Sequence, residues 1–232
     1  MVETVGNVEQ VIYEGSDDDR DVGGVNTAMF RDFSRRRSLV ATHLHGCTML
    51  VIIGRKGVYM GHYWENISFD PDTWNQLDGE TPADTFQRTV ITGLRDGKHY
   101  DRRYKPEQMS LTDFAQQLRD DHVKPTPTPS PLPVFTPAQQ GYPQEWQLIN
   151  GEVIRILPKI GKPNRWEEIL YDPPEESVEE DTSDKTPSGR DLVKFDPEHQ
   201  IAPGGHRGPG PQRLVKMWVE YAEVHSTDWY GN

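Results

Sequence analysis

The sequence predicts a mixed α and β fold with a strand-rich core, formed by one domain over residues 1–232. Two apolar, β-branched segments on either side of a short turn predict a central hairpin, and at least four other segments have the composition of strands. Two amphipathic segments with capping residues predict helices after the hairpin. A length of 232 residues is typical of a single domain with long loops.

Composition excludes some classes of function. A formal net charge of −12 argues against nucleic acid as a partner, because phosphates attract clustered Lys and Arg. A single cysteine can form no disulfide within the chain. The N-terminus lacks a signal peptide, and no stretch approaches the ~18 apolar residues of a membrane span. We therefore expect a cytoplasmic protein, with secretion by a route that needs no signal peptide left open.

An apolar hairpin is the strongest structural signal in the chain. Residues 48–53 and 58–62 are rich in β-branched and apolar side chains, as strands are. The turn between them contains Gly54 and Gly57, either of which can adopt the positive φ that tight turns require. These residues are therefore expected to form the centre of the fold.

The length of this turn decides which side chains of the hairpin face each other. A two-residue loop that begins at Gly54 puts Cys47 directly opposite His62. A four-residue loop puts His62 opposite Met49 and diagonal to Cys47 on the same face. A three-residue loop would separate the two, but it needs a left-handed conformation at a residue other than glycine. Both favoured registers bring a thiol and an imidazole to one face.

Two amphipathic helices are expected after the hairpin. Thr81 is a suitable N-cap, Pro82 suits the first helical position, and Asp84 completes a capping box. Gly97 is a stop signal for this helix, and Ser110 repeats the cap for the next one. The apolar stripes expected to face the core are Phe86, Val90, Ile91 and Leu94 in the first helix and Leu111, Phe114, Ala115 and Leu118 in the second.

The other segments are expected to be strands or surface loops. The predicted strands cover residues 9–13, 38–42, 63–65 as a continuation of the hairpin, 151–157, 166–171, 192–196 and 213–224. The Pro-rich stretch 124–133 is expected to be a surface spacer, because its prolines remove backbone donors. The acidic stretch 172–190 has few apolar side chains and is expected to be a disordered loop.

Cys47 and His62 are the candidate catalytic pair. A thiol with a pKa of about 8.5 is mostly protonated at neutral pH, and a neighbouring imidazole is the usual means of forming the thiolate. Gly46 permits close approach of the backbone, so the N–H of Cys47 would serve as an oxyanion donor. The alternative is structural: a Cys at the head of a strand is often an inert hydrophobe, and a single strand His is often only hydrogen-bonded.

The segment Leu44-His45-Gly46-Cys47-Thr48, with His62 fifteen residues after Cys47, resembles a known signature. It is similar to the Leu-Ser-Gly-Cys-Thr motif and downstream His of the cytotoxic necrotizing factor catalytic domain. Bacterial lethal-factor deamidases and chemoreceptor glutamine deamidases share that fold and that pair. The resemblance covers residues 38–65. It implies a β-sandwich of mixed sheets flanked by helices, with no cofactor, that deamidates a protein glutamine through a thioester. The implied substrate is a glutamine-bearing protein such as a small GTPase.

The departures from this signature indicate further site residues. His45 stands where those enzymes commonly have Ser, and Trp64 follows closely on His62 where the toxins have small residues, so both are candidates for substrate binding. In the family, the catalytic His is oriented by a backbone carbonyl in some members and by a Thr side chain in others. Thr42 is the candidate for that role here.

Two other classes of function stay open. His43, His45 and Cys47 alternate along one strand face with His62 adjacent, and three imidazoles with a thiolate would satisfy tetrahedral zinc. Gly46 interrupts a regular strand there, and we expect no metal. The third class is a catalytically inactive interaction domain on the same scaffold, because a fold does not impose a function.

Overall fold

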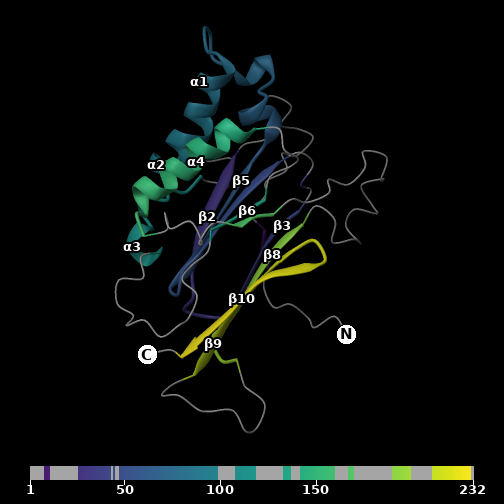
Figure 1. Ribbon diagram of the computed structural model, residues 1–232, viewed down its shortest axis with the longest axis vertical. Coiled ribbons are helices and arrows are strands. Elements are labelled where there is room, and N and C mark those ends of the chain that lie inside the picture. The colour runs from purple at the N-terminus through teal and green to yellow at the C-terminus, as the bar shows by residue number, and fades with distance from the viewer. Residues whose placement is uncertain are drawn as a thin grey trace.

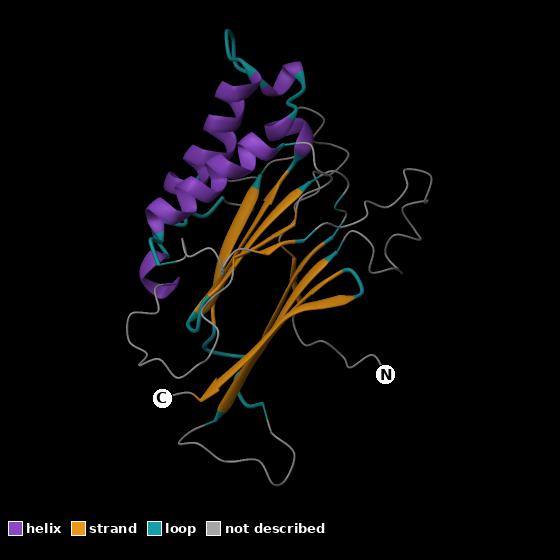
Figure 2. Ribbon diagram, in the orientation of Figure 1, coloured by secondary structure: helices purple, strands orange, loops and turns teal. Residues whose placement is uncertain are grey.

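The structure is a computed structural model, and it describes residues 8–10, 26–42, 44, 47–98, 108–118, 133–136, 142–159, 167–169, 190–199 and 211–230. In these residues two five-stranded sheets pack face to face, and the helices cover the outer face of one of them (Figures 1 and 2). The predicted α+β fold with a central sandwich and flanking helices is confirmed.

Each sheet is mixed, with one parallel pair of strands at one edge. Sheet A contains, in spatial order, β1 (Val8–Gln10), β3 (Arg37–Ala41), β8 (Asp191–Asp196), β9 (Gln212–Val219) and β10 (Ala222–Tyr230). Sheet B contains β2 (Thr27–Asp32), β5 (Gly57–Tyr63), β4 (Thr48–Ile53), β6 (Pro133–Thr136) and β7 (Glu167–Glu168). The pairs β1–β3 and β6–β7 are parallel, and the other pairs are antiparallel.

The helical layer lies against sheet B only. Its elements are the π-helix η1 (Glu65–Phe69), the 3-10 helix η2 (Thr73–Asn75), α1 (Pro82–Phe86), the π-helix η3 (Gln87–Thr92), α2 (Gly93–Asp96), α3 (Ala115–Leu118) and α4 (Pro143–Ile156). Among the described helices, none is long and apolar enough to cross a membrane.

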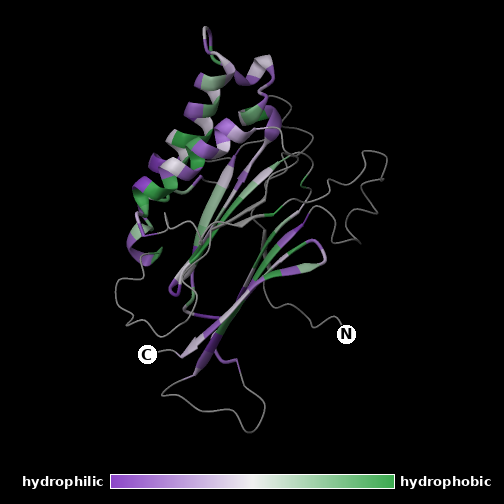
Figure 3. Ribbon diagram, in the orientation of Figure 1, coloured by the Kyte–Doolittle hydropathy of each residue, from purple (hydrophilic) through white to green (hydrophobic). Residues whose placement is uncertain are grey.

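Strand β4 is buried on both faces and separates two apolar cores. Met49, Val51 and Ile53 belong to the core between the sheets. Leu50 and Ile52 belong to the core between sheet B and the helices. Hydrophobic residues accordingly recur along the strands of sheet B and along the helices that cover it (Figure 3). This burial on both faces explains why the segment has a continuous apolar run instead of an alternating pattern.

The first predicted helix is confirmed from its cap to its stop. The side chain of Thr81 accepts a hydrogen bond from the N–H of Asp84 at 3.3 Å, and the N–H of Thr81 donates to the Asp84 carboxylate at 3.0 Å. The run ends at Gly97, which has a φ of 74°. Its middle is a π-turn, and the Thr89 carbonyl there accepts hydrogen bonds from the amides of Asn26 and Gln108. The second helix is described only as the single turn α3.

The predicted strand over residues 151–157 is wrong, because this segment is the C-terminal half of α4. Trp146, Ile149, Val153 and Ile156 are buried along one side of that helix, at spacings of three and four residues. The helix begins at Pro143, a residue common in the first turn. The β-branched residues in the second half of α4 resemble a strand when they are considered without the first turns of the helix.

The predicted single strand over residues 213–224 is also wrong. It is two strands, β9 and β10, joined by a tight turn in which Glu220 has a φ of 53°. The sequence offers no glycine at this turn, so the reversal has no signal. Strand β2 has no predicted counterpart. The predicted extension over residues 63–65 is confirmed for Tyr63, the last residue of β5, and wrong beyond it, because η1 begins at Glu65.

The two predicted surface stretches lie almost entirely outside the described residues. Of the Pro-rich stretch only Pro133 is described, and it is the first residue of β6, a position that proline tolerates. Of the acidic stretch only Arg190 is described, and its carbonyl accepts the N–H of Glu220 at 2.8 Å. Their predicted exposure stays a prediction. The strands expected over residues 38–42 and 192–196 are confirmed as β3 and β8.

Candidate active site

The β4–β5 hairpin has the second of the two expected registers. His62 pairs with Met49, and Val58 pairs with Ile53. The N–H of Gly54 donates to the carbonyl of Gly57 at 2.8 Å. Cys47, the residue before β4, is therefore diagonal to His62, and such diagonal neighbours are about 7–8 Å apart in antiparallel pairs.

Gly57 of this turn serves packing and not conformation. Neither Gly54 nor Gly57 has a positive φ, so the conformational reason given for them from the sequence is wrong. A Cβ on Gly57 would overlap the ring of Phe30 and lie 2.6 Å from the carbonyl oxygen of Arg31. Glycine is required there because strand β2 passes so close to β5.

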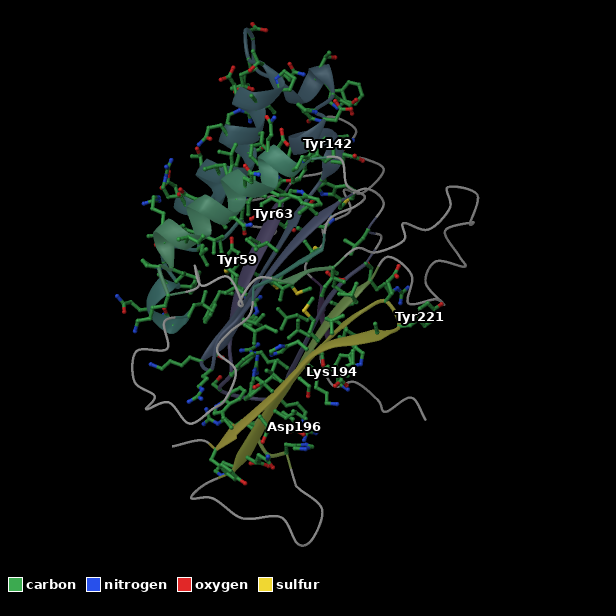
Figure 4. All side chains as sticks on the ribbon, in the orientation of Figure 1. Tyr59, Tyr63, Tyr142, Lys194, Asp196 and Tyr221 are labelled. Carbon is green, nitrogen blue, oxygen red and sulfur yellow. The ribbon has the colours of Figure 1, made fainter. Side chains whose placement is uncertain are left out.

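Cys47 and His62 both lie in the core between the two sheets. Cys47 belongs to that core, and His62 follows Val58 and Met60 on the same face of β5. The other face of β5 carries Tyr59 and Tyr63, which lie towards the helices (Figure 4). The expected placement of thiol and imidazole on one face is therefore present. Both side chains are fully buried, with 0% of their surface exposed.

Burial makes His62 a neutral imidazole. The loss of solvent lowers its pKa from 6.5 to about 3, so the ring carries no charge at neutral pH. Within the described part of the chain, neither ring nitrogen has a hydrogen-bond partner. The ring meets Trp64 edge-on, with 4.8 Å between ring centroids and 87° between ring planes. The imidazole is thus neutral, and its unprotonated nitrogen accepts no hydrogen bond from the described residues.

Asn26 holds the chain in place directly after the candidate pair. Its Oδ1 accepts the N–H of Trp64 at 2.9 Å, and its Nδ2 donates to the Ser68 hydroxyl at 2.7 Å. Its side chain is only 1% exposed, so these are buried hydrogen bonds. Asn26 therefore fixes the exit from β5 into η1 and, through Trp64, one side of the His62 ring. Sequence reasoning missed it, because an isolated Asn in a polar loop carries no distinguishing pattern.

No protein-family model, curated protein or solved structure matches the chain. The resemblance to glutamine deamidases therefore stays an expectation from the sequence around Cys47 and His62.

The other predicted site residues are placed only in part. Thr42 directly follows β3 in sheet A and is buried, but it makes no hydrogen bond to the His62 ring. His45 and Gly46 lie outside the described residues, as does His43 of the zinc alternative. Among the residues that are described, no group of three or more His, Cys, Asp or Glu side chains is arranged to hold a metal.

Proposed function

We propose that this chain is a cysteine-dependent hydrolase of the glutamine deamidase type, related to the cytotoxic necrotizing factor catalytic domain. The observation that carries the proposal is the β4–β5 register, which puts Cys47 and His62 on one face of sheet B. The Leu44-His45-Gly46-Cys47-Thr48 motif supports it from the sequence. The substrate class is a protein glutamine side chain.

In the proposed reaction the Cys47 sulfur attacks the carbonyl carbon of the glutamine carboxamide while its proton passes to the imidazole of His62. The imidazolium then protonates the departing amine, and the C–N bond breaks to give ammonia and a thioester. Water attacks the thioester carbonyl, His62 accepts a proton from it, and that proton returns to the sulfur as glutamate leaves. The backbone N–H of Cys47 would stabilise the tetrahedral oxyanion.

The buried state of His62 does not by itself support the first step of this scheme. A pKa of about 3 keeps the imidazole neutral at physiological pH, but it also makes the ring a weak base towards a thiol whose ordinary pKa is about 8.5. The same dry surroundings disfavour a thiolate beside an imidazolium. Because both groups are fully buried, the reaction requires the substrate to open the edge between the sheets and bring a polar carboxamide and water to the pair.

Complete burial is also the observation that favours a second candidate, an inactive interaction domain on the same scaffold. Cys47 and His62 have no exposed surface, and in the described residues the His62 ring has no hydrogen bond to keep it in one orientation. A core thiol beside a neutral imidazole is compatible with a purely structural role. The two candidates differ in whether His62 influences the chemistry of the thiol.

The direct test is conversion of glutamine to glutamate in cellular proteins. A cell lysate is incubated with the purified wild type or with Cys47→Ser, and tryptic peptides are compared by mass spectrometry. We expect specific glutamines that become glutamate with the wild type and stay intact with Cys47→Ser. If every conversion occurs equally with both proteins, the hydrolase proposal fails and the interaction domain is preferred.

A further inference from the structure

Two large apolar side chains are exposed on the loop segment that joins η1 to α1: Trp74 lies within η2, and Leu77 follows two residues after η2 ends. Trp74 has 73% of its surface exposed and Leu77 has 59%, although most of the described large apolar residues are buried. The loop adjoins α1 at one end of the helical layer (Figure 1). An exposed Trp is typical of the centre of a protein interaction site, and an exposed Leu three residues away in sequence adds apolar surface to this segment.

Hydrogen bonds hold this loop in one conformation. The Asn75 amide donates to the carbonyl of Asn66 at 2.8 Å, and the Gln76 amide donates to the carbonyl of Pro71 at 3.0 Å. The N–H of Leu77 donates to the Glu80 carboxylate at 2.9 Å. A loop that is already ordered loses little conformational entropy when it binds a partner, so the exposure of Trp74 is suited to recognition.

The sequence around Trp74 is rich in carboxylates, and one guanidinium, that of Arg88, contacts the segment. Residues 65–84 contain six carboxylates and no Lys, Arg or His. Arg88, the nearest Lys or Arg in sequence, donates to the carbonyl of Asn75 at 2.9 Å and forms an ion pair with Glu80 at 2.6 Å, which lowers the pKa of that carboxyl to about 2. In the part of the chain that the structure describes, no cationic side chain forms an ion pair with Asp70, Asp72 or Asp78. An apolar centre with a negative rim selects a partner with apolar and basic side chains.

We propose that the Trp74 surface, formed by Trp74, Leu77, Asp70, Asp72 and Asp78, docks a lysine- or arginine-rich amphipathic segment of a partner protein. A second copy of this chain fits less well, because it would bring carboxylates against carboxylates at a net charge of −12 per chain. We identify this partner with the protein substrate of the hydrolase, and that identification rests on the proposed function. Helix η1, which leads into the loop, starts directly after Trp64, and Trp64 contacts His62.

The test is the binding of a labelled synthetic peptide, measured by fluorescence anisotropy. The peptide has Leu at helical spacing on one face and Lys on the other, and a second peptide has Glu in place of Lys. All proteins carry Cys47→Ser, so that binding is measured without turnover. A failure to bind then contradicts the docking proposal and leaves the hydrolase proposal untouched. The tested variant is Trp74→Ser with Leu77→Ser.

The matched control is Tyr221→Ser. Tyr221 is also 73% exposed, but it lies in the turn between β9 and β10 (Figure 4). We expect the Lys peptide to bind, roughly tenfold weaker binding to the Trp74 and Leu77 variant, and no change with Tyr221→Ser. Added salt should weaken the binding.

Several results would overturn the proposal. They are no binding of the Lys peptide, equal binding of the Glu peptide, and binding that the Trp74 and Leu77 substitutions leave unchanged. Sedimentation analysis of the same proteins tests the other occupant considered above, a second copy of this chain. If the wild type is a dimer that these substitutions convert to a monomer, the surface is a self-association site instead.

Discussion

His62 is the residue whose environment bears most directly on the proposed chemistry. Its imidazole is fully buried, and in the described residues neither nitrogen forms a hydrogen bond. A buried polar group without a partner costs about 1–3 kcal/mol, so an apolar side chain would serve the core better. A titratable side chain in an apolar core, on a strand whose neighbour follows directly after the sole cysteine, is typical of a functional position.

The buried imidazole should make folding sensitive to acid. In the unfolded chain His62 has its ordinary pKa of 6.5, whereas in the folded chain it is about 3. Between these values the unfolded state binds the additional proton, so the free energy of unfolding falls as the pH falls from 6.5 towards 3. The slope is at most about 1.4 kcal/mol per pH unit for one proton.

Chemical denaturation at a series of pH values measures this effect. His62→Gln keeps a polar side chain that does not titrate, so we expect its free energy of unfolding to depend less steeply on pH than that of the wild type. Burial also lowers the pKa of His225, which is unchanged in both proteins and adds the same slope to each. Identical slopes in the two proteins would show that His62 is not buried as described.

At the residue scale the sequence predicts which face of a strand a side chain lies on better than it predicts how deeply that side chain is buried. Cys47 and His62 share a face because strands alternate and the turn has few allowed lengths. Their complete burial comes from sheet A, in which β8 to β10 begin only at Asp191. Asn26 and its partner Ser68 are likewise far apart in sequence, so nothing local indicates their hydrogen bond.

At the element scale two glycines should respond in opposite ways to substitution by alanine. Gly57→Ala forces a Cβ into the Phe30 ring and the backbone of β2, and overpacking of this kind typically costs about 1–3 kcal/mol. Gly151 lies in the middle of α4, and a Cβ there meets nothing within 4 Å. Gly151→Ala should therefore stabilise the protein by about 0.5–1 kcal/mol through helix propensity.

Thermal unfolding of the two variants beside the wild type measures both effects. A lower melting temperature for Gly57→Ala and a higher one for Gly151→Ala are expected. If Gly57→Ala has the same melting temperature as the wild type, strands β2 and β5 are not as close as the structure places them. A loss of stability in Gly151→Ala would show that this face of α4 is covered.

Elements with local signals are the ones that the sequence predicts. The helix from Pro82 has a capping box at its start and Gly97 at its end, and both are confirmed. The turn at Glu220 has neither glycine nor asparagine, and its conformation is imposed by the pairing of β9 with β10. For α4 the sequence shows β-branched residues, and the packing against sheet B overrides that preference.

At the scale of the whole molecule, the sandwich keeps the candidate pair away from solvent. The core that contains Cys47 takes side chains from both sheets, so the thiol can react only when the edge between them opens. In the opened state water returns to His62, and its pKa should move back towards the ordinary value of 6.5. A hydrolase would then use the imidazole as a base, whereas a structural His would leave the thiol unaffected.

The rate of Cys47 alkylation by iodoacetamide, measured against pH in the wild type and in His62→Gln, tests the catalytic pair most directly. Cys47 is the sole cysteine, so all labelling reports on it. Well above the ordinary thiol pKa of about 8.5 the thiolate forms without help from His62. The ratio of the wild-type rate to the His62→Gln rate at that pH therefore corrects for any difference in how often the edge between the sheets opens in the two proteins. Relative to that reference, we expect the wild type to react roughly tenfold faster than His62→Gln near neutral pH, because the imidazole assists ionisation. A constant ratio at every pH, with both rates following an ordinary thiol titration, would contradict the catalytic pair and leave Cys47 as a core residue.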